Sequence, residues 1–173
     1  QDNDAKFPWR YYLINSGMAR HNLSIDNVEI ITRIKIPNRL LKLKTRVNQM
    51  KVGDGFEEGV ELGPLINADA GAKVKEHIED AVSKGAKIIL GNAKDDQAGN
   101  FFEPTIVTGV TQEMKVATEE TFGPFAPLFK FEDEDEVIAM ANDTIFGLAS
   151  YFYAKDLSRV YKVAEALEYG IVG

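Results

Sequence analysis

The chain contains no cysteine, and this absence removes disulfides, thiolate metal sites and a cysteine nucleophile from its 173 residues. Histidine is also scarce. His21 and His77 are too few and too far apart in sequence for a recognisable zinc pattern. His77 falls on a predicted helix, where we expect a partly exposed surface residue. The sequence therefore predicts no metal site.

Long apolar runs and an excess of basic residues are missing too. No run approaches the roughly 18 residues of a membrane span, and the N-terminal residues do not have the layout of a signal peptide. Lys and Arg total 20 against 27 Asp and Glu, which gives a net charge of -7. A nucleic-acid partner would require a basic face. We expect no nucleic-acid or membrane partner, and a cytoplasmic location.

What is present is enough for one folded domain. The hydrophobic share is 45%, which favours a packed core over disorder. From Asn67 onward, helical and strand patterns alternate, with strands predicted at Lys87–Leu90, Pro104–Thr108, Phe125–Phe131, Ala149–Ala154 and Gly170–Gly173. This alternation is typical of an α/β fold with parallel pairing. Pro127 predicts an edge strand or a bulge for Phe125–Phe131.

Helix boundaries are marked by capping residues. Asn67 or Asp69 is expected to cap one helix, Asp133 begins the next, and Asp156 caps the last. A further helix is predicted at Arg39–Lys51 from its apolar spacing. Residues 1–38 do not share this pattern, although Val28–Ile36 is rich in β-branched residues and predicts a strand that Pro37 ends.

The stretch Glu119–Pro127 combines two carboxylates, an aromatic residue and a Gly-Pro turn. A carboxylate before such a turn presents two acceptor oxygens, which is what recognition of a ribose diol requires. Phe122 offers a flat apolar face to a ring. A charged surface turn followed by a core strand explains the same residues, so chemistry alone leaves both interpretations open.

Glu120–Pro124 also resembles the signature turn of the NAD(P)-dependent aldehyde dehydrogenases, most closely those of the succinate-semialdehyde type. Five further motifs occur in the order and rough spacing of that family: Leu62–Ile66, Asn100–Thr105, Asn142–Leu148, Tyr151–Asp156 and Glu168–Gly173. The resemblance runs from about Leu40 to Gly173. It implies a layered α/β catalytic domain with a mostly parallel sheet and helices on both faces.

The resemblance also implies a chemistry. In the family a cysteine thiolate adds to the aldehyde, a hydride leaves to the nicotinamide, and water releases the acid. Carried over residue by residue, Glu120 matches the glutamate that binds the nicotinamide ribose, and Phe122 matches the aromatic residue beside the nicotinamide. No catalytic residue of the family has a counterpart here. The expected cofactor is NAD or NADP, the substrate an aldehyde, and the assembly a homo-oligomer.

Two hypotheses follow. In the first, residues 39–173 are part of the catalytic domain of an aldehyde-oxidising enzyme, preceded by a front segment, 1–38, of unclear origin. These residues are then expected to be inactive alone, since the nucleophile is missing. In the second, the chain is a non-catalytic α/β module or interaction domain derived from that family.

Overall fold

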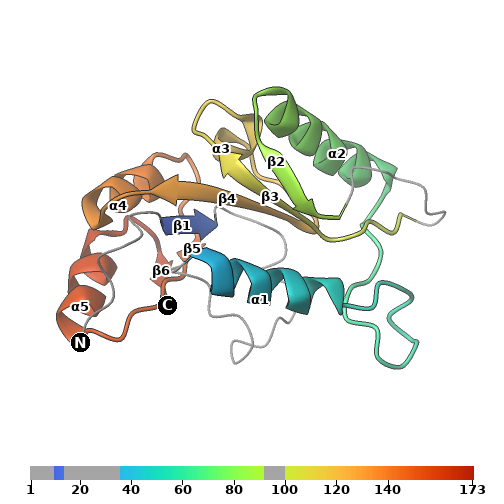
Figure 1. The fold of residues 1–173 in the computed structure, drawn as a ribbon, viewed down its shortest axis with the longest axis horizontal. Coiled ribbons are helices and arrows are strands. Elements are labelled where there is room, and N and C mark those ends of the chain that lie inside the picture. Colours follow the sequence, from blue (N-terminus) through green and yellow to red (C-terminus); the bar gives the residue numbers. More distant parts are fainter. Residues whose placement is uncertain (1–9, 14–35, 92–99) are drawn as a thin grey trace.

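The computed structural model describes residues 10–13, 36–91 and 100–173. Its elements follow the chain in this order: β1 (Arg10–Leu13), α1 (Ile36–Asn48), α2 (Ala68–Ser83), β2 (Lys87–Leu90), β3 (Thr105–Val110), α3 (Lys115–Thr118), β4 (Phe125–Phe131), α4 (Glu134–Asn142), β5 (Ala149–Ser150), α5 (Leu157–Ala166) and β6 (Ile171–Val172). Figure 1 shows α1 and α2 on opposite sides of the larger sheet. The α/β class is confirmed.

The larger sheet has the strand order β1-β4-β3-β2. Only the central pair, β3 and β4, is parallel, while β1–β4 and β2–β3 are antiparallel. The sheet is thus mixed, where a mostly parallel one was expected. Parallel neighbours need a crossover connection, and α3 lies in the one between β3 and β4. The described part of the β2–β3 connection contains no helix, which suits an antiparallel return.

Strand β4 is an inner strand, so the edge strand drawn from Pro127 is wrong. The alternative was a bulge, and the pairing of β4 with β3 does shift register, between Thr108 and Val110 of β3. The antiparallel partner β1 pairs with Leu128–Phe131 only. Pro127 pairs with Val107 of β3 and lies beyond the end of β1. The missing backbone N–H of Pro127 therefore removes no hydrogen bond to β1.

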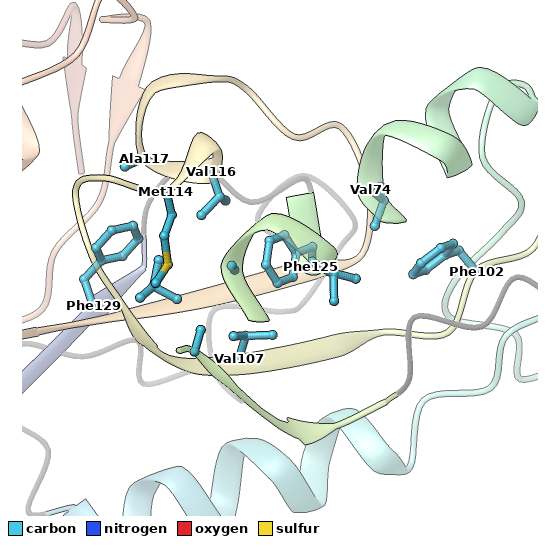
Figure 2. Packing of buried hydrophobic residues seen from close by; sticks show 12 residues of the cluster. Val74, Phe102, Val107, Met114, Val116, Ala117, Phe125 and Phe129 are labelled. Atoms are coloured by element: carbon cyan, nitrogen blue, oxygen red, sulfur yellow. The ribbon is translucent and has the colours of Figure 1, made fainter. Parts of the chain in front are cut away.

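Two apolar cores lie on the two faces of the sheet. Phe125 and Phe129 of β4 pack with Val74 and Ile78 of α2 and with residues around α3 (Figure 2). On the opposite face, Ala126 and Leu128 pack with Val47 of α1 and with Met50, which follows the end of that helix. Successive side chains of a strand point to opposite faces, so the apolar run of β4 supplies both cores. Helices on both faces are confirmed.

A second, smaller sheet pairs β5 and β6 in parallel, with α5 between them in sequence. Asn142, the last residue of α4, joins α4 to the end of α5. Its Nδ2 donates to the carbonyl of Ala166, and its Oδ1 accepts from the amide of Glu168 at 3.0 Å. Ion pairs Arg159–Glu134 and Lys162–Asp135 also link the two helices. The strand predicted at Ala149–Ala154 is shorter than expected.

Local helix signals agree with the structure. The side chains of Asn67, Asp133 and Asp156 each accept a backbone N–H of the helix that follows. Helix α1 begins three residues before the predicted Arg39, with Pro37 in its first turn, where a missing N–H costs nothing. The remainder of the strand predicted at Val28–Ile36 lies outside the described residues. Among the described helices, none is long and apolar enough to cross a membrane.

The double-sided core leads to a prediction about stability. Leu128→Ala empties a fully buried site on the α1 face, so we expect the free energy of unfolding to fall by about 2–5 kcal/mol. The matched control is Leu41→Ala, because Leu41 is 61% exposed and the change should stay within about 0.5 kcal/mol. Urea unfolding followed by circular dichroism measures both. Equal losses in the two variants would contradict the described burial of β4.

Candidate functional site

The Glu119–Pro124 turn joins α3 to β4. Glu119 ends α3 in an extended conformation, with φ -113° and ψ 140°. At the other end, the carbonyl of Pro124 accepts a hydrogen bond of 2.9 Å from the amide of Thr105, the first residue of β3. The turn is therefore attached to the central pair of strands and runs directly into the core.

Burial alternates along this turn. Thr121 is 2% exposed and Gly123 is buried, while Phe122 between them is 54% exposed and Glu120 is partly exposed. Side chains of extended backbone alternate in direction. The two residues predicted to bind a cofactor thus lie on one side of the turn, and Thr121 and Gly123 lie on the other, against α2.

Gly123 allows the turn to approach α2 closely. A methyl group added at Gly123 would overlap with Cγ2 of Val74, and it would lie 3.6 Å from Cδ2 of Leu65. Because Val74 is itself a buried residue of the larger core, it has little room to move aside. Glycine is required here by the close approach rather than by its backbone angles.

His77 is the second contact between α2 and the turn. It is fully buried, so the expectation of a partly exposed surface residue is wrong. Its Nδ1 lies 2.5 Å from Oγ1 of Thr121, and its Nε2 lies 3.3 Å from Oε2 of Glu119. These partners stand 44 and 42 residues away in sequence, and no local pattern relates them.

Burial decides the protonation of this histidine. Removal from water lowers the pKa of His77 below its usual value, and the repulsion of Lys73 acts in the same direction. The carboxylates of Glu119 and Glu76 oppose this shift without reversing it. Lys73 also lies 3.8 Å from Oε2 of Glu119, so that carboxylate is shared between the two side chains. The imidazole is accordingly neutral at neutral pH.

Several of the sequence motifs converge on this site. The amide of Leu65 donates to the carbonyl of Asn100 at 2.8 Å, and Leu65 packs near Gly123. The motifs that begin at Leu62, Asn100 and Glu119 thereby meet beside α2. The three later motifs meet at the smaller sheet, where the amides of Gly170 and Ile171 donate to the carbonyls of Gly147 and Leu148.

The chemistry of the turn fits the nicotinamide end of a dinucleotide. A partly exposed carboxylate and an exposed aromatic face lie on one side, which suits a diol and a flat ring. A carboxylate attracts a cationic ring and repels a phosphate. Within the described ranges, no group of three acidic or histidine side chains is placed to hold a metal. A cavity of about 150 Å³ lies near the end of α1, and no residue of the turn lines it.

Comparison with known proteins gives a family. A sequence model described as "Aldehyde dehydrogenase family" matches residues 30–173. A glutarate-semialdehyde dehydrogenase of Pseudomonas putida is 64% identical over 132 residues, which are 76% of this chain and 27% of that protein. The NADP(+) succinate-semialdehyde dehydrogenase GabD of Escherichia coli is 59% identical over 132 residues, with the same two shares, 76% and 27%.

Solved structures give the same result. An Escherichia coli NADP dependent enzyme superposes with a TM-score of 0.76 at 57% identity, covering 78% of this chain and 28% of that one. A betaine aldehyde dehydrogenase from Staphylococcus aureus, in complex with NAD+, superposes with a TM-score of 0.72 at 36% identity, covering 78% and 27%. The chain spans about a quarter of the length of the curated relatives it matches.

The lowered pKa of His77 predicts that stability depends on pH. In the unfolded chain this imidazole takes up a proton near pH 6.5, but in the folded chain only at lower pH. Between these values the unfolded state binds more protons, so the free energy of unfolding should fall as the pH drops from about 7.5 to about 5.5. Urea titrations at several pH values measure the slope.

The matched variants for this prediction are His77→Asn and His21→Asn. Only these two histidines are present, so His77→Asn should flatten the pH dependence in that window while His21→Asn retains it. Carboxylates whose pKa is lowered, such as Glu61 and Asp80, titrate below the window. An unchanged slope in His77→Asn would contradict the assignment.

Close packing at Gly123 predicts that even an alanine at this position destabilises the fold. Gly123→Ala should lower the free energy of unfolding by about 1–3 kcal/mol, because the added methyl group overlaps with Val74. At Gly55 an added methyl group meets nothing within 4 Å, so Gly55→Ala should be neutral or stabilising by up to about 1 kcal/mol. Thermal unfolding of the pair is the measurement. A neutral Gly123→Ala would rule out the tight contact.

Proposed function

Since the chain belongs to the aldehyde dehydrogenase family, we propose that residues 39–173 are part of a catalytic domain that oxidises an aldehyde to its acid with NAD or NADP. Residues 1–38 are a front segment of unclear origin in this proposal, from which Arg10–Leu13 adds strand β1 to the larger sheet. The substrate class proposed is a semialdehyde, which carries an aldehyde at one end and a carboxylate at the other, such as succinate semialdehyde. Semialdehyde dehydrogenases from two bacteria, at 59% and 64% identity, support it.

One observation carries the proposal: the turn exposes Glu120 and Phe122 on the same side while Thr121 and Gly123 anchor it to α2. In this role the carboxylate of Glu120 accepts hydrogen bonds from the nicotinamide ribose hydroxyls. The ring of Phe122 would lie beside the nicotinamide and would shield one face of it from water. When bound, the cofactor accepts a hydride from the substrate.

The nucleophile of the reaction is not supplied by these residues, since the 173 residues include no cysteine. The role proposed for this chain is therefore to position the cofactor. The same absence favours the second hypothesis, in which the chain is a non-catalytic module derived from the family. The two are separated by whether the turn supports turnover when a nucleophile is provided.

Assembly and location complete the proposal. Exposed apolar side chains gather at and beside the smaller sheet, with Ile145, Leu148, Tyr151 and Ile171 between 57% and 90% exposed. Such a group of side chains marks contact surfaces. We place the chain in a homo-oligomer, in the cytoplasm, with a small-molecule aldehyde as its substrate.

The test transfers the segment into an enzyme that has the nucleophile. The 132 matching residues of this chain replace their counterparts in the Escherichia coli enzyme GabD, and NADPH production from succinate semialdehyde is recorded. We expect the chimera to turn over. Glu120→Ala in the chimera should lower kcat/KM for NADP by about 10- to 100-fold, because hydrogen bonds to a charged group contribute about 1.5–3 kcal/mol.

Two controls accompany the chimera. Glu58→Ala removes an exposed carboxylate from the loop after α1 and should leave kcat/KM unchanged. The 173-residue chain alone should give no turnover, because loss of a covalent nucleophile costs on the order of a million-fold in rate. Turnover by the chain alone would reveal another nucleophile, and a chimera indifferent to Glu120→Ala would refute the role of that carboxylate.

A further inference from the structure

We propose that His77 is a positioning residue for the cofactor-binding turn: its two ring nitrogens hold Thr121 and Glu119 against α2 and so direct Glu120 and Phe122 outward. The ligand's identity rests on the proposed function. The positioning itself is a property of this chain, and it can be measured without any ligand.

The two hydrogen bonds fix the tautomer of the imidazole. An ionised carboxylate only accepts hydrogen bonds, so Nε2 of His77 carries the proton and donates to Glu119, 3.3 Å away. The neutral ring then has a lone pair on Nδ1. That nitrogen accepts from the hydroxyl of Thr121 at 2.5 Å. One side chain thereby binds alternate residues of the turn by opposite hydrogen-bond roles.

His77 is held rigidly because it lies on the buried face of α2. Val74, Ile78 and Ala81 lie on the buried face of α2 with His77, and all are at most 1% exposed. A ring locked by such packing holds its partners more precisely than a loop residue would. With the Gly123–Val74 contact, the turn is fixed at two points on its inner side. The outer residues between those points have their directions set by backbone alternation.

The charges around the ring favour this neutral form. Lys73 and Glu76 of α2 and Glu119 at the end of α3 are the charged groups that act on it, and Lys115 of α3 pairs with Glu76. Burial opposes a second proton more strongly than the carboxylates favour it. A proton on Nδ1 would convert the acceptor for Thr121 into a donor, so the hydroxyl would have to rotate and accept instead. At low pH the direction of this hydrogen bond is therefore reversed.

The experiment uses the full chain labelled with ¹⁵N. Long-range proton–nitrogen spectra at pH 8 should show Nε2 of His77 protonated and Nδ1 bare. Backbone order parameters of Glu120 and Phe122 should be near ~0.85, the value for rigid backbone, and should fall toward ~0.6 in Thr121→Val and His77→Leu. His77→Asn should recover part of the rigidity, because its side-chain oxygen accepts the Thr121 hydroxyl.

Ile78→Val is the matched control for general loss of stability. It shortens the buried neighbour of His77 on the same helix but leaves both hydrogen bonds in place. The turn should remain as rigid as in the unchanged chain. Thr121→Val with order parameters equal to those of Ile78→Val, or a proton on Nδ1 at pH 8, would overturn the proposal. So would amide shifts of Thr121 and Phe122 that titrate identically with and without His77.

A second experiment, with a ligand, distinguishes failure of this proposal from failure of the proposed cofactor-binding function. Nicotinamide riboside at millimolar concentration is followed by saturation transfer from the protein. If the turn loosens as expected but no variant shows transfer, positioning by His77 stands and the cofactor proposal fails. If transfer depends on Glu120 but neither transfer nor order parameters respond to Thr121→Val, the cofactor proposal stands and positioning by His77 is wrong.

Discussion

Burial of β4 on both faces is the constraint on which the rest of the structure depends. Phe125 and Phe129 pack under α2 and α3, while Ala126 and Leu128 pack over the end of α1. A one-residue slip would exchange the two sets of side chains and leave neither core filled. Since the Glu119–Pro124 turn leads directly into this strand, the register of β4 also sets the position of the proposed cofactor residues.

The site combines a polar anchor with an apolar one. Thr121 and His77 satisfy each other inside the protein, and an unpaired group at either place would cost about 1–3 kcal/mol. Gly123 against Val74 fills the adjacent space without any polar atom. Surface ion pairs such as Lys51–Glu57 contribute far less, because both partners are solvated. The direction of Glu120 and Phe122 is thus controlled from the buried side of the turn.

The two groups of sequence motifs stabilise different parts of the fold. Near the turn, the amide of Thr105 attaches Pro124 to β3, and the amide of Leu65 bonds the segment before α2 to Asn100. The motifs near the smaller sheet hold β5, β6 and the ends of α4 and α5 together. The side chain of Asn142 there bonds the carbonyl of Ala166 and the amide of Glu168. This second group also includes exposed apolar side chains, among them Ile145 and Leu148.

The sequence by itself determined the α/β class and the helix starts at Asn67, Asp133 and Asp156, because caps and apolar periodicity are local features. It also determined the family, because motifs keep their order along the chain. It also singled out Glu120 and Phe122, whose role stays a proposal. Only the tertiary structure decided the mixed strand directions, the pairing of β1 and the burial of His77. Those depend on contacts between residues far apart in sequence, and the partners of His77 become neighbours only when α2 packs over β4.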